Sequence, residues 1–397
     1  MIIGVPAESF PDEKRVALVP AFIPNLAKAG LEVHMEQGAG LNAGFPDSAY
    51  VEQGAHLVAE RSQLFSSADV LLQVHGLGFN SITSDNDLEL VHSRQVVIGL
   101  FNPLGNPGIA EYLAEKGITT FALELVPRIS RAQPMDVLSS MATIAGYKAV
   151  MLAAGALNKI YPMMITAAGT ITPSRVFIVG AGVAGLQAIA TSRRLGAVVQ
   201  SYDIRPAVKE QVESLGAKFL ELKLETEEAE TSGGYAKAMD EEFYRRQREM
   251  MKQVVAESDV VITTAAVPGK KAPVLITEEM VQGMHPGSVI VDLAAEGGGN
   301  CDLTRPGETI EVHGVHILGP LNLPSTIPYH ASQMYAKNVT TFLENLVKDG
   351  ERNLNLEDPI IKDTLLTHKG EVVNPMVREL LGLPASSQPA SNERSDS

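Results

Sequence analysis

Short apolar runs alternate with helical patterns over the first 125 residues of the chain. The stretches 20–28 and 109–115 place apolar side chains at the spacing of a helix that is buried on one face. Runs rich in valine, leucine and isoleucine have the length of buried strands, and they lie at 2–5, 33–36, 70–74, 96–100 and 119–123. Strands that alternate with helices are typical of a parallel sheet with helices on its faces. The pattern therefore predicts an α/β domain at the start of the chain.

The same alternation returns further along the chain. Residues 142–157 form an alanine-rich helix pattern with few charges, which we expect to be buried. Strand patterns follow at 175–179, 197–202, 260–264, 289–293 and 316–318, and a last long helix pattern lies at 332–348. We predict two Rossmann-like parallel-sheet α/β domains separated by a cleft, the first of them discontinuous. Residues 1–135, completed by 320–380, form the first domain, and residues 136–319 form the second.

Two segments depart from this compact pattern. Residues 225–252 are dense in charge and contain Ser232-Gly-Gly234, which favours a mobile loop or lid; a solvated surface helix without a role is the alternative. The tail from residue 383 to 397 is rich in serine, proline and asparagine, and we predict that it is disordered.

Composition excludes several classes of protein. The net charge is −15 and no basic cluster is present, which argues against a nucleic-acid partner. The single cysteine, Cys301, rules out an internal disulfide and fits a reducing, cytoplasmic compartment. No signal-peptide pattern precedes the first strand, and no apolar run reaches transmembrane length. The histidines show no metal-ligand spacing with one another or with Cys301, so we predict no metal site.

One stretch places three closely spaced glycines between a strand pattern and a helix pattern. The strand pattern 175–179 is followed by Gly180, Gly182 and Gly185 in a G-x-G-x-x-G turn, and a helix pattern runs from 186 to 195. Gly180 permits a tight turn, Gly182 lets a pyrophosphate approach the backbone, and Gly185 lets the helix pack close to the strand. The helix N-terminus offers N–H groups and a favourable dipole to phosphates. An ordinary glycine turn is the lesser alternative, and the stretch predicts a dinucleotide site.

The next strand pattern ends at Asp203. Its carboxylate can accept hydrogen bonds from an adenosine ribose and would repel a 2′-phosphate, so we predict NAD(H) and not NADP(H) as the cofactor. Arg205, two residues further on, is the feature that argues the other way. The residues expected to contact the dinucleotide in this region of the chain are Gly180, Gly182, Val183, Ala184, Gly185, Asp203, Ile204 and Arg205.

Several further stretches resemble one group of proteins. Gly4-Val-Pro-Ala-Glu-Ser9 with Arg15-Val-Ala-Leu-Val-Pro20 resembles the alanine dehydrogenase and transhydrogenase superfamily, and so do 267–273 and 287–294. The run Val126-Pro-Arg-Ile-Ser-Arg-Ala-Gln-Pro-Met-Asp-Val-Leu-Ser-Ser140 resembles the Arg-Gln-Asp loop of the NAD(H)-binding component of proton-translocating NAD(P) transhydrogenase. Ser232-Gly-Gly-Tyr-Ala-Lys237 resembles the mobile loop of that component. The resemblance extends from residue 1 to about residue 380.

This resemblance implies one half of a two-site reaction. NAD(H) would be bound by this chain and NADP(H) by a partner component, and hydride would pass directly between the two, so no general acid or base is required. A membrane proton-channel component would complete the enzyme. The resemblance thus implies a cytoplasmic chain that associates peripherally with the inner membrane through its partner subunits, and it also implies a homodimer.

Two positions depart from the alanine dehydrogenase pattern. His75 stands where those enzymes place a lysine that binds the substrate carbonyl, and Asn102 stands where they place a catalytic histidine, although Arg15 persists. Deamination needs a group that polarises the carbonyl and a proton carrier, so we expect this activity to be lost. The alternatives are an alanine-dehydrogenase-like NAD-dependent oxidoreductase and a non-catalytic NAD(H)-sensing module.

The resemblance also assigns roles to the loop after residue 126. Arg128 and Gln133 would reach the nicotinamide end of the cofactor. Asp136 and Ser139 would fix its carboxamide and ribose, unless one of them simply caps the following helix. These four are the catalytic candidates. The loop residues expected to contact the cofactor are Arg128, Ile129, Ser130, Gln133, Asp136 and Ser139.

Three further stretches supply expected contacts. Tyr235, beside Gly234, would close the mobile segment over the cofactor, unless it packs locally. Ala265 and Ala266 end a strand pattern, and the carboxyl ends of strands line the ligand crevice of open α/β sheets, so we expect them near the nicotinamide. A plain strand terminus is the alternative there. Residues 296–300 follow the next strand pattern and form either a turn or a contact for the cofactor or a partner.

Overall fold

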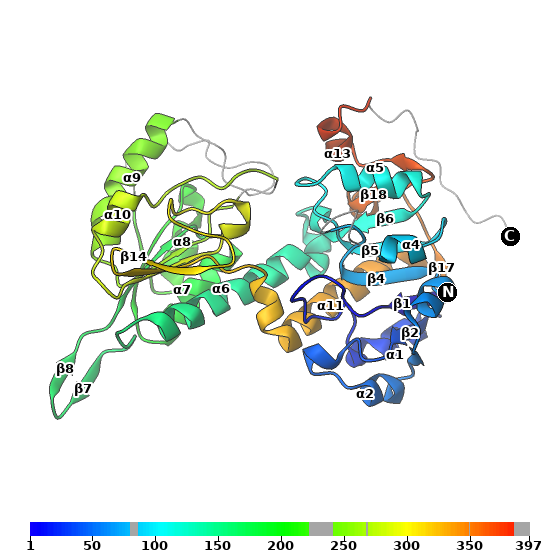
Figure 1. Cartoon of the computed structure of the whole chain (residues 1–397), viewed down its shortest axis with the longest axis horizontal. Helices are drawn as coiled ribbons and strands as arrows, with labels where there is room; N and C mark the ends of the chain where they lie inside the picture. The colour runs from blue at the N-terminus through cyan, green and yellow to red at the C-terminus, as the bar shows by residue number, and fades with distance from the viewer. Residues whose placement is uncertain (80–85, 222–240, 267–268, 349, 385–397) are drawn as a thin grey trace. The chain divides into compact units, whose positions relative to one another are not determined.

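The computed structural model describes residues 1–79, 86–221, 241–266, 269–348 and 350–384 (Figure 1). The chain divides into two compact units. Unit 1 comprises residues 1–141 and the segment from residue 324 onward, and unit 2 comprises residues 142–323. Each unit is built on one large, mostly parallel sheet, so the predicted α/β class with two Rossmann-like domains is confirmed. The predicted cleft stays a prediction.

The sheet of unit 1 has the strand order β19-β18-β6-β5-β4-β1-β2-β3. Its parallel strands are β1 (Ile2–Val5), β2 (Glu32–Glu36), β3 (His56–Val58), β4 (Val70–His75), β5 (Val96–Leu100) and β6 (Thr119–Ala122). Strands β18 (Leu365–His368) and β19 (Glu371–Val372) extend it in antiparallel fashion. The buried hydroxyl of Thr367 donates to the carbonyl of Ile118 and pairs with the hydroxyl of Thr120 at 2.7 Å. The returning segment is thus fixed to β6, which confirms the discontinuous first domain.

Helix α11 (Pro328–Leu346) also returns to unit 1. Its Tyr335 is fully buried and donates its hydroxyl hydrogen to the carbonyl of Gln73 in β4, at 2.7 Å. The remaining α-helices of this unit are α1 (Ile23–Lys28), α2 (Asp47–Glu52), α3 (Arg61–Ser67), α4 (Asp87–Leu90), α5 (Gly108–Glu115), α12 (Pro359–Thr364) and α13 (Pro375–Leu380). Short 3-10 helices lie at η1 (Pro20–Phe22), η2 (Leu41–Ala43), η3 (Leu123–Leu125) and η4 (Ser130–Met135), and β16 (Val347–Lys348) pairs with β17 (Glu351–Arg352).

The sheet of unit 2 has the order β11-β10-β9-β12-β13-β15-β14. The strands are β9 (Arg175–Val179), β10 (Val198–Tyr202), β11 (Lys218–Phe219), β12 (Val260–Thr263), β13 (Val289–Asp292), β14 (Thr309–Val312) and β15 (Val315–Leu318). Only β14 runs antiparallel within this described sheet. The helices are α6 (Val137–Ala156, which starts in unit 1), α7 (Val183–Arg194), α8 (Lys209–Ser214), α9 (Glu241–Ala256) and α10 (Glu278–Gln282), with 3-10 turns η5 (Pro206–Val208) and η6 (Ala295–Gly297). The order reverses beside β9, where doubly wound sheets bind ligands.

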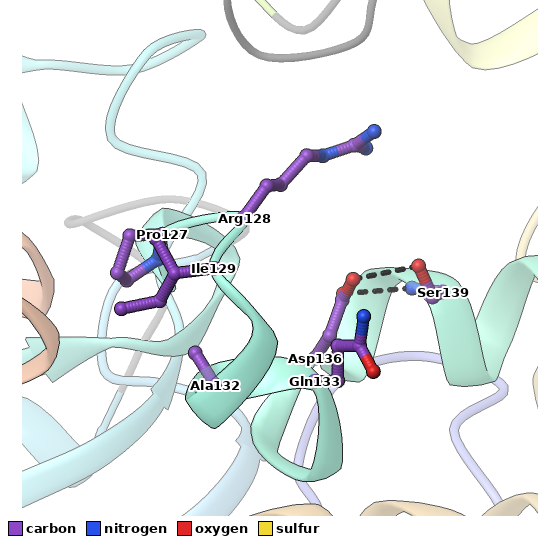
Figure 2. Close-up of a pocket in the computed structure, with 7 residues that line it drawn as sticks. All are labelled: Pro127, Arg128, Ile129, Ala132, Gln133, Asp136 and Ser139. Carbon is purple, nitrogen blue, oxygen red and sulfur yellow. Dashed lines mark hydrogen bonds between the residues drawn. The ribbon is translucent and has the colours of Figure 1, made fainter.

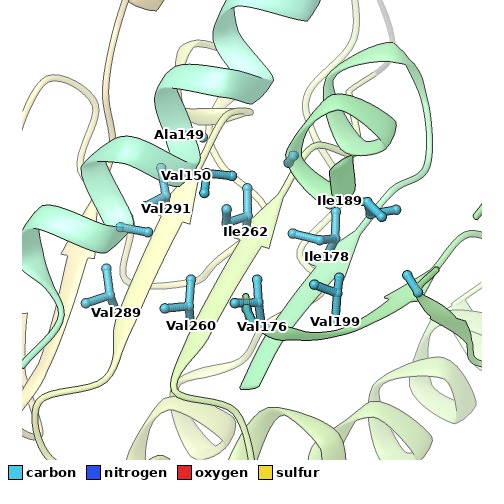
Figure 3. Packing of buried hydrophobic residues seen from close by; sticks show 14 of the residues in the cluster. Ala149, Val150, Val176, Ile178, Ile189, Val199, Val260, Ile262, Val289 and Val291 are labelled. Carbon is cyan, nitrogen blue, oxygen red and sulfur yellow. The ribbon is translucent and has the colours of Figure 1, made fainter. Parts of the chain in front are cut away.

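Strand β9 is buried on both faces of the sheet. Val176 and Ile178 belong to a core under α6 and α7, which Figure 3 shows on the same face. Phe177 and Val179 point to the opposite face and pack in a second core. Because successive side chains alternate between the faces, a strand covered on both sides must be apolar on both faces, as the four residues of β9 after the exposed Arg175 are.

Helix α6 begins five residues earlier than the sequence pattern indicated. With the extra turn it becomes, among the residues that the structure describes, the one helix long and apolar enough to cross a membrane by length and composition. The expectation that no apolar run reaches this length was therefore wrong. So was the expectation that this helix is buried, since 39% of the stretch is buried. Core helices of globular domains have the same length and composition, and Ala149, Val150 and Ala153 pack against the sheet of unit 2.

One feature of unit 2 was not predicted from the sequence. Strands β7 (Met164–Thr166) and β8 (Gly169–Ile171) form a hairpin that projects from the sheet (Figure 1). Of the segment 225–252, residues 225–240 lie outside the described residues, and Gly234 and Tyr235 are among them. The rest of the segment belongs to α9, whose Met251 and Val255 are buried.

Candidate functional site

The glycine turn after β9 is shaped by close backbone contacts. Gly180 has φ +98°, and a Cβ there would lie 2.4 Å from the hydroxyl oxygen of Thr264. A Cβ on Gly185 would lie 1.9 Å from the carbonyl oxygen of Gly180. A Cβ on Gly182 would meet nothing within 4 Å. Packing therefore demands glycine at 180 and 185, whereas the backbone at Gly182 faces open space that a ligand can approach.

Helix α7 points its N-terminus at this open space. Gly182 caps the helix, and its first turn contains no acidic residue that would oppose the positive end of the helix dipole. Helix α6 presses against the same turn, because a Cβ on Gly146 would lie 2.2 Å from the carbonyl oxygen of Ala184. Gly146 thus helps to fix the position of the turn. The sequence pattern gave no sign of this contact, which joins two segments far apart in the chain.

The carboxylate of Asp203 lies beside the turn, at the end of β10, and is 8% exposed. One of its oxygens accepts the backbone N–H of Ala181 at 2.7 Å. The same carboxylate is paired side-on with the guanidinium of Arg205, with both nitrogen–oxygen distances at 2.9 Å. Half-buried Ile204 lies between them in the chain. Asp203 therefore has the placement expected for a ribose contact, but it is engaged by Arg205.

The carboxyl end of β12 is braced by a buried asparagine. Asn300 accepts the backbone N–H of Ala265 at 3.0 Å and donates its amide to the carbonyl of the same residue at 2.8 Å. Asp292, also fully buried, accepts the backbone N–H of Asn300 at 2.7 Å. Ala266, next along, is exposed. The sequence pattern predicted a turn or a contact at 296–300 and not this brace, although Asp292, the polar last residue of the apolar strand β13, could have signalled it.

A hollow of about 340 Å³ lies in unit 1, at the loop after residue 126 (Figure 2). Five of the six loop residues expected to contact a cofactor line it, and Ser130 does not. The lining residues are Pro127, Arg128, Ile129, Ala132, Gln133, Asp136 and Ser139. They come from η4, the residues on either side of it and the first turn of α6, so a single short segment shapes the hollow.

Asp136 and Ser139 form a pair at the start of α6. The backbone N–H of Ser139 donates to one carboxylate oxygen of Asp136 at 2.9 Å, and its hydroxyl donates to the other at 2.6 Å. Asp136 therefore caps helix α6, which was the alternative to a cofactor contact that the sequence left open. Each carboxylate oxygen of Asp136 retains an acceptor position, so capping leaves Asp136 able to bind a ligand in the hollow.

Gln133 and Arg128 differ in their surroundings. The amide of Gln133 makes no hydrogen bond to any described residue, and the side chain is exposed beside Asp136. Arg128 extends away from Gln133 and Asp136 in Figure 2. Of the four catalytic candidates, the structure thus brings Gln133, Asp136 and Ser139 together and turns Arg128 outward.

The loop is held in place from the C-terminal segment. Arg131 forms a bidentate ion pair with Asp358, which caps α12. Asn338 of α11 donates its amide to the carbonyl of Pro134 at 2.8 Å. Arg131 therefore has a structural partner, and Asn338 is a positioning residue that sequence reasoning missed.

The carboxyl edge of the unit 1 sheet is closed around His75. Its ring forms a three-ring cluster with those of Phe10 and Phe79, whose centroids lie 4.4 and 4.2 Å away, and its Nε2 lies 2.8 Å from Glu13. Burial raises the pKa of Glu8, which accepts the N–H groups of Val74 and His75, to about 8. Side chains thus fill this edge.

Glu124 has an equivalent role beside the neighbouring strand, β5. A single oxygen of its carboxyl group accepts the backbone N–H groups of Phe101 and Asn102, and its other oxygen is buried without a partner. Burial raises the pKa of Glu124 to about 7. Asn102 has φ +51° and offers its backbone here. Among the residues that the structure describes, no group of three or more histidine, cysteine, aspartate or glutamate side chains could hold a metal ion.

Comparison with known proteins gives matches over nearly the whole chain. The family models "Alanine dehydrogenase/PNT, N-terminal domain" and "Alanine dehydrogenase/PNT, C-terminal domain" match residues 4–145 and 149–375. An NAD(P) transhydrogenase subunit alpha polypeptide of Rhodospirillum rubrum is 46% identical over 378 residues, which are 94% of this chain and 98% of the relative.

Solved structures give the same picture. A transhydrogenase structure from Sinorhizobium meliloti superposes with a TM-score of 0.81 at 43% identity, over 94% of this chain and 99% of the other. An L-alanine dehydrogenase structure superposes with a TM-score of 0.78 at 27% identity, over 96% and 99%. The resemblance inferred from the sequence is confirmed.

Proposed function

The chain belongs to the alanine dehydrogenase/PNT family, and we propose that within this family it is the NAD(H)-binding subunit of a proton-translocating NAD(P) transhydrogenase. Relatives named as transhydrogenase alpha subunits are 42–46% identical to it. In this proposal hydride passes directly between NAD(H) on this chain and NADP(H) on a partner component, and a membrane component couples the transfer to proton translocation.

The residues of unit 2 fit a dinucleotide. Gly182 leaves its backbone open, the first turn of α7 is free of acidic residues, and Asp203 stands beside the turn. We assign the pyrophosphate to this turn and the adenosine ribose to Asp203. The full set of proposed contacts in and after this turn is Gly180, Gly182, Val183, Ala184, Gly185, Asp203, Ile204, Arg205, Gly234, Tyr235, Ala265 and Ala266.

The observation that carries the proposal is the chemistry of the hollow in unit 1. Its lining offers an unpaired amide at Gln133 and a carboxylate–hydroxyl pair at Asp136 and Ser139, but no histidine, lysine or cysteine. A bound nicotinamide would supply the hydride. The chain's residues then need only hold a carboxamide, orient a ring and exclude water, because transfer between two nicotinamides needs no proton donor or acceptor. Arg128, Ile129, Ser130, Gln133, Asp136 and Ser139 are assigned to this task.

An alanine-dehydrogenase-like activity is the second candidate, since the fold allows it. The position of the expected lysine holds His75, which is 9% exposed, hydrogen-bonded to Glu13 and in contact with two phenylalanine rings. A small substrate would have to displace these side chains. The observation therefore favours transhydrogenation.

The partners follow from the same proposal. The chain would be cytoplasmic and would associate with the inner membrane through its NADP(H)-binding and proton-channel partners. A homodimer has support from the β7–β8 hairpin, where Met163, Met164, Ile165 and Ile171 are 60, 44, 81 and 43% exposed. Apolar side chains on a two-stranded hairpin gain by burial against another surface, and a second copy of the chain is the proposed one.

The candidate functions differ in two simple assays. The purified chain should not oxidise alanine with NAD, and it should transfer hydride from NADH to an NADP analogue once its NADP(H)-binding partner is added. Alanine oxidation at ordinary enzyme rates by the chain alone would support the dehydrogenase instead. Binding of NADH without any transfer in the presence of the partner would support an NAD(H)-sensing module.

A further inference from the structure

The carboxylate of Asp203 accepts four N–H groups in this structure. One oxygen accepts the backbone N–H of Ala181 at 2.7 Å and Nη2 of Arg205 at 2.9 Å. The other accepts the backbone N–H of Arg205 at 2.8 Å and its Nε at 2.9 Å. A carboxylate has about four acceptor positions. The residue assigned to the ribose is therefore saturated by donors of its own chain.

Two of these four bonds can be exchanged without moving the backbone. The N–H groups of Ala181 and Arg205 belong to the main chain beside β9 and β10 and stay where they are. The guanidinium of Arg205 is a side chain, and its two bonds can be replaced by the two hydroxyl groups of a ribose. A neutral diol can thus take over the hydrogen bonds that Arg205 releases, and Asp203 remains fully satisfied.

A ribose with a 2′-phosphate has no such exchange available. While Arg205 stays on Asp203, the two charges neutralise each other, and the phosphate meets a saturated ion pair with no positive charge left to attract it. If Arg205 swings out to meet the phosphate, it leaves the charge of the 8% exposed Asp203 uncompensated next to a second anion. Both positions of the side chain disfavour a 2′-phosphate.

We propose that Arg205 is a specificity-determining residue whose pairing with Asp203 withholds it from 2′-phosphates, so that this chain rejects NADP(H). The inference rests on the proposed function, in which Asp203 contacts the ribose. The inference also explains why an arginine, Arg205, lies beside the carboxylate assigned to the ribose. A transhydrogenase needs different dinucleotides on its two sites, because the same one on both would give no net reaction. On this account Arg205 could bind a 2′-phosphate, and its ion pair with Asp203 prevents it from doing so.

The test is a double-mutant cycle with two small probes, 5′-AMP and 2′,5′-ADP, whose binding is measured by calorimetry on the full chain. In Asp203→Asn, the amide can keep the acceptor for Ala181 but turns an N–H toward the guanidinium, which releases Arg205. We expect 5′-AMP to bind about tenfold more weakly and 2′,5′-ADP at least about tenfold more tightly than to the wild type. Arg205→Gln alone completes the cycle, and in Asp203→Asn combined with Arg205→Gln the gain for 2′,5′-ADP relative to Arg205→Gln alone should disappear.

Two results would overturn the inference. One is a gain for 2′,5′-ADP of equal size with glutamine at position 205, and the other is no gain in Asp203→Asn. If Asp203→Asn does not fold, Asp203→Ser with and without Arg205→Gln repeats the cycle, because a serine hydroxyl can also accept the N–H of Ala181. Failure of the wild-type chain to bind NADH or 5′-AMP at all would instead count against the proposed function.

Discussion

The carboxyl edges of the two sheets have the same architecture and opposite chemistry. In unit 1 Glu8 accepts the last two backbone N–H groups of β4, Glu124 accepts the two that follow β5, and two aromatic rings pack against His75. In unit 2 the chain after β9 is glycine, and open space lies over Gly182. In unit 1 the carboxylates of the chain itself accept the backbone N–H groups at the strand ends. In unit 2 the corresponding space is open to an anionic ligand. Two sheets of one fold thus divide into a closed edge and a binding edge, and side chains at the strand ends decide which is which.

The largest effect should come from Gly185→Ala, at the binding edge. Its methyl group would lie 1.9 Å from a backbone oxygen, so strand and helix must separate. We expect a loss of about 3 kcal/mol or more in the free energy of unfolding, measured in urea, together with loss of NADH binding. Gly182→Ala is the matched control: its φ of −75° suits alanine and its Cβ meets nothing. It should keep wild-type stability and still bind NADH more weakly. Unimpaired binding would show that nothing approaches Gly182.

The next effect concerns stability at the closed edge. Because the pKa of buried Glu124 is raised to about 7, the folded state holds a proton there that the unfolded state releases near its ordinary value of 4.5. Stability from this group is present below pH 4.5 and is lost as pH rises to about 7, by about 3 kcal/mol.

Glu124→Gln should remove this loss. Glutamine keeps an oxygen for the N–H groups of Phe101 and Asn102 and places its amide nitrogen at the unpartnered position. Urea unfolding at pH 5 and pH 8 should show a smaller decline for the variant than for the wild type. Equal declines would mean that Glu124 is ionised in the folded chain throughout this range.

Gln133→Asn should show that hydride transfer depends on the hollow of unit 1 and not on the closed edge of the same unit. Shortening the side chain by one methylene moves the amide by more than about 1 Å, and we expect hydride transfer to slow by about 100-fold while NADH affinity changes by less than about threefold. The control is His75→Gln, which should transfer hydride at the wild-type rate. A slow His75→Gln, or equal losses of rate and affinity in Gln133→Asn, would contradict this division.

The smallest effect is expected at the support of the loop. Asn338→Ala removes the amide that donates to the carbonyl of Pro134 next to Gln133. Transfer should slow by about tenfold, with NADH affinity unchanged, because the loop loses one of its anchors. Stopped-flow rates at saturating NADH measure this. If only thermal stability changed, Asn338 would serve the fold and not the positioning of Gln133.

The sequence predicted the elements that depend on local patterns. The apolar runs at Ile2–Val5, Val96–Leu100 and Arg175–Val179 became strands with those bounds, because a buried parallel strand must be apolar on both faces. The start of α6 was missed, since its first turn contains two serines and lacks the alanine-rich pattern of the rest of the helix. The β7–β8 hairpin was missed because none of its residues is buried within the chain and so no alternation marks it.

The candidate site was only partly predictable, because only some of its contacts depend on residues that are close together in the sequence. Glycine spacing and the resemblance of the loop at 126–140 pointed to residues that lie close together in sequence. The supports could not be found in this way: Asn300 reaches back 35 residues to Ala265, and Asn338 reaches 204 residues to Pro134. Nor does spacing show that Asp203 and Arg205 satisfy each other, because the strand has ended before them and the direction of each side chain depends on how the chain turns.

The central claim is that hydride passes directly from NADH on this chain to an acceptor on its partner. The most direct test uses NADH deuterated at the transferred position of C4, NADP and the NADP(H)-binding partner in ordinary water, with the product analysed by mass spectrometry. The account predicts that the deuterium appears in NADPH without dilution and that no label enters the product when the unlabelled reaction is run in D₂O. Label exchanged with solvent, or no transfer to NADP at all, would contradict it.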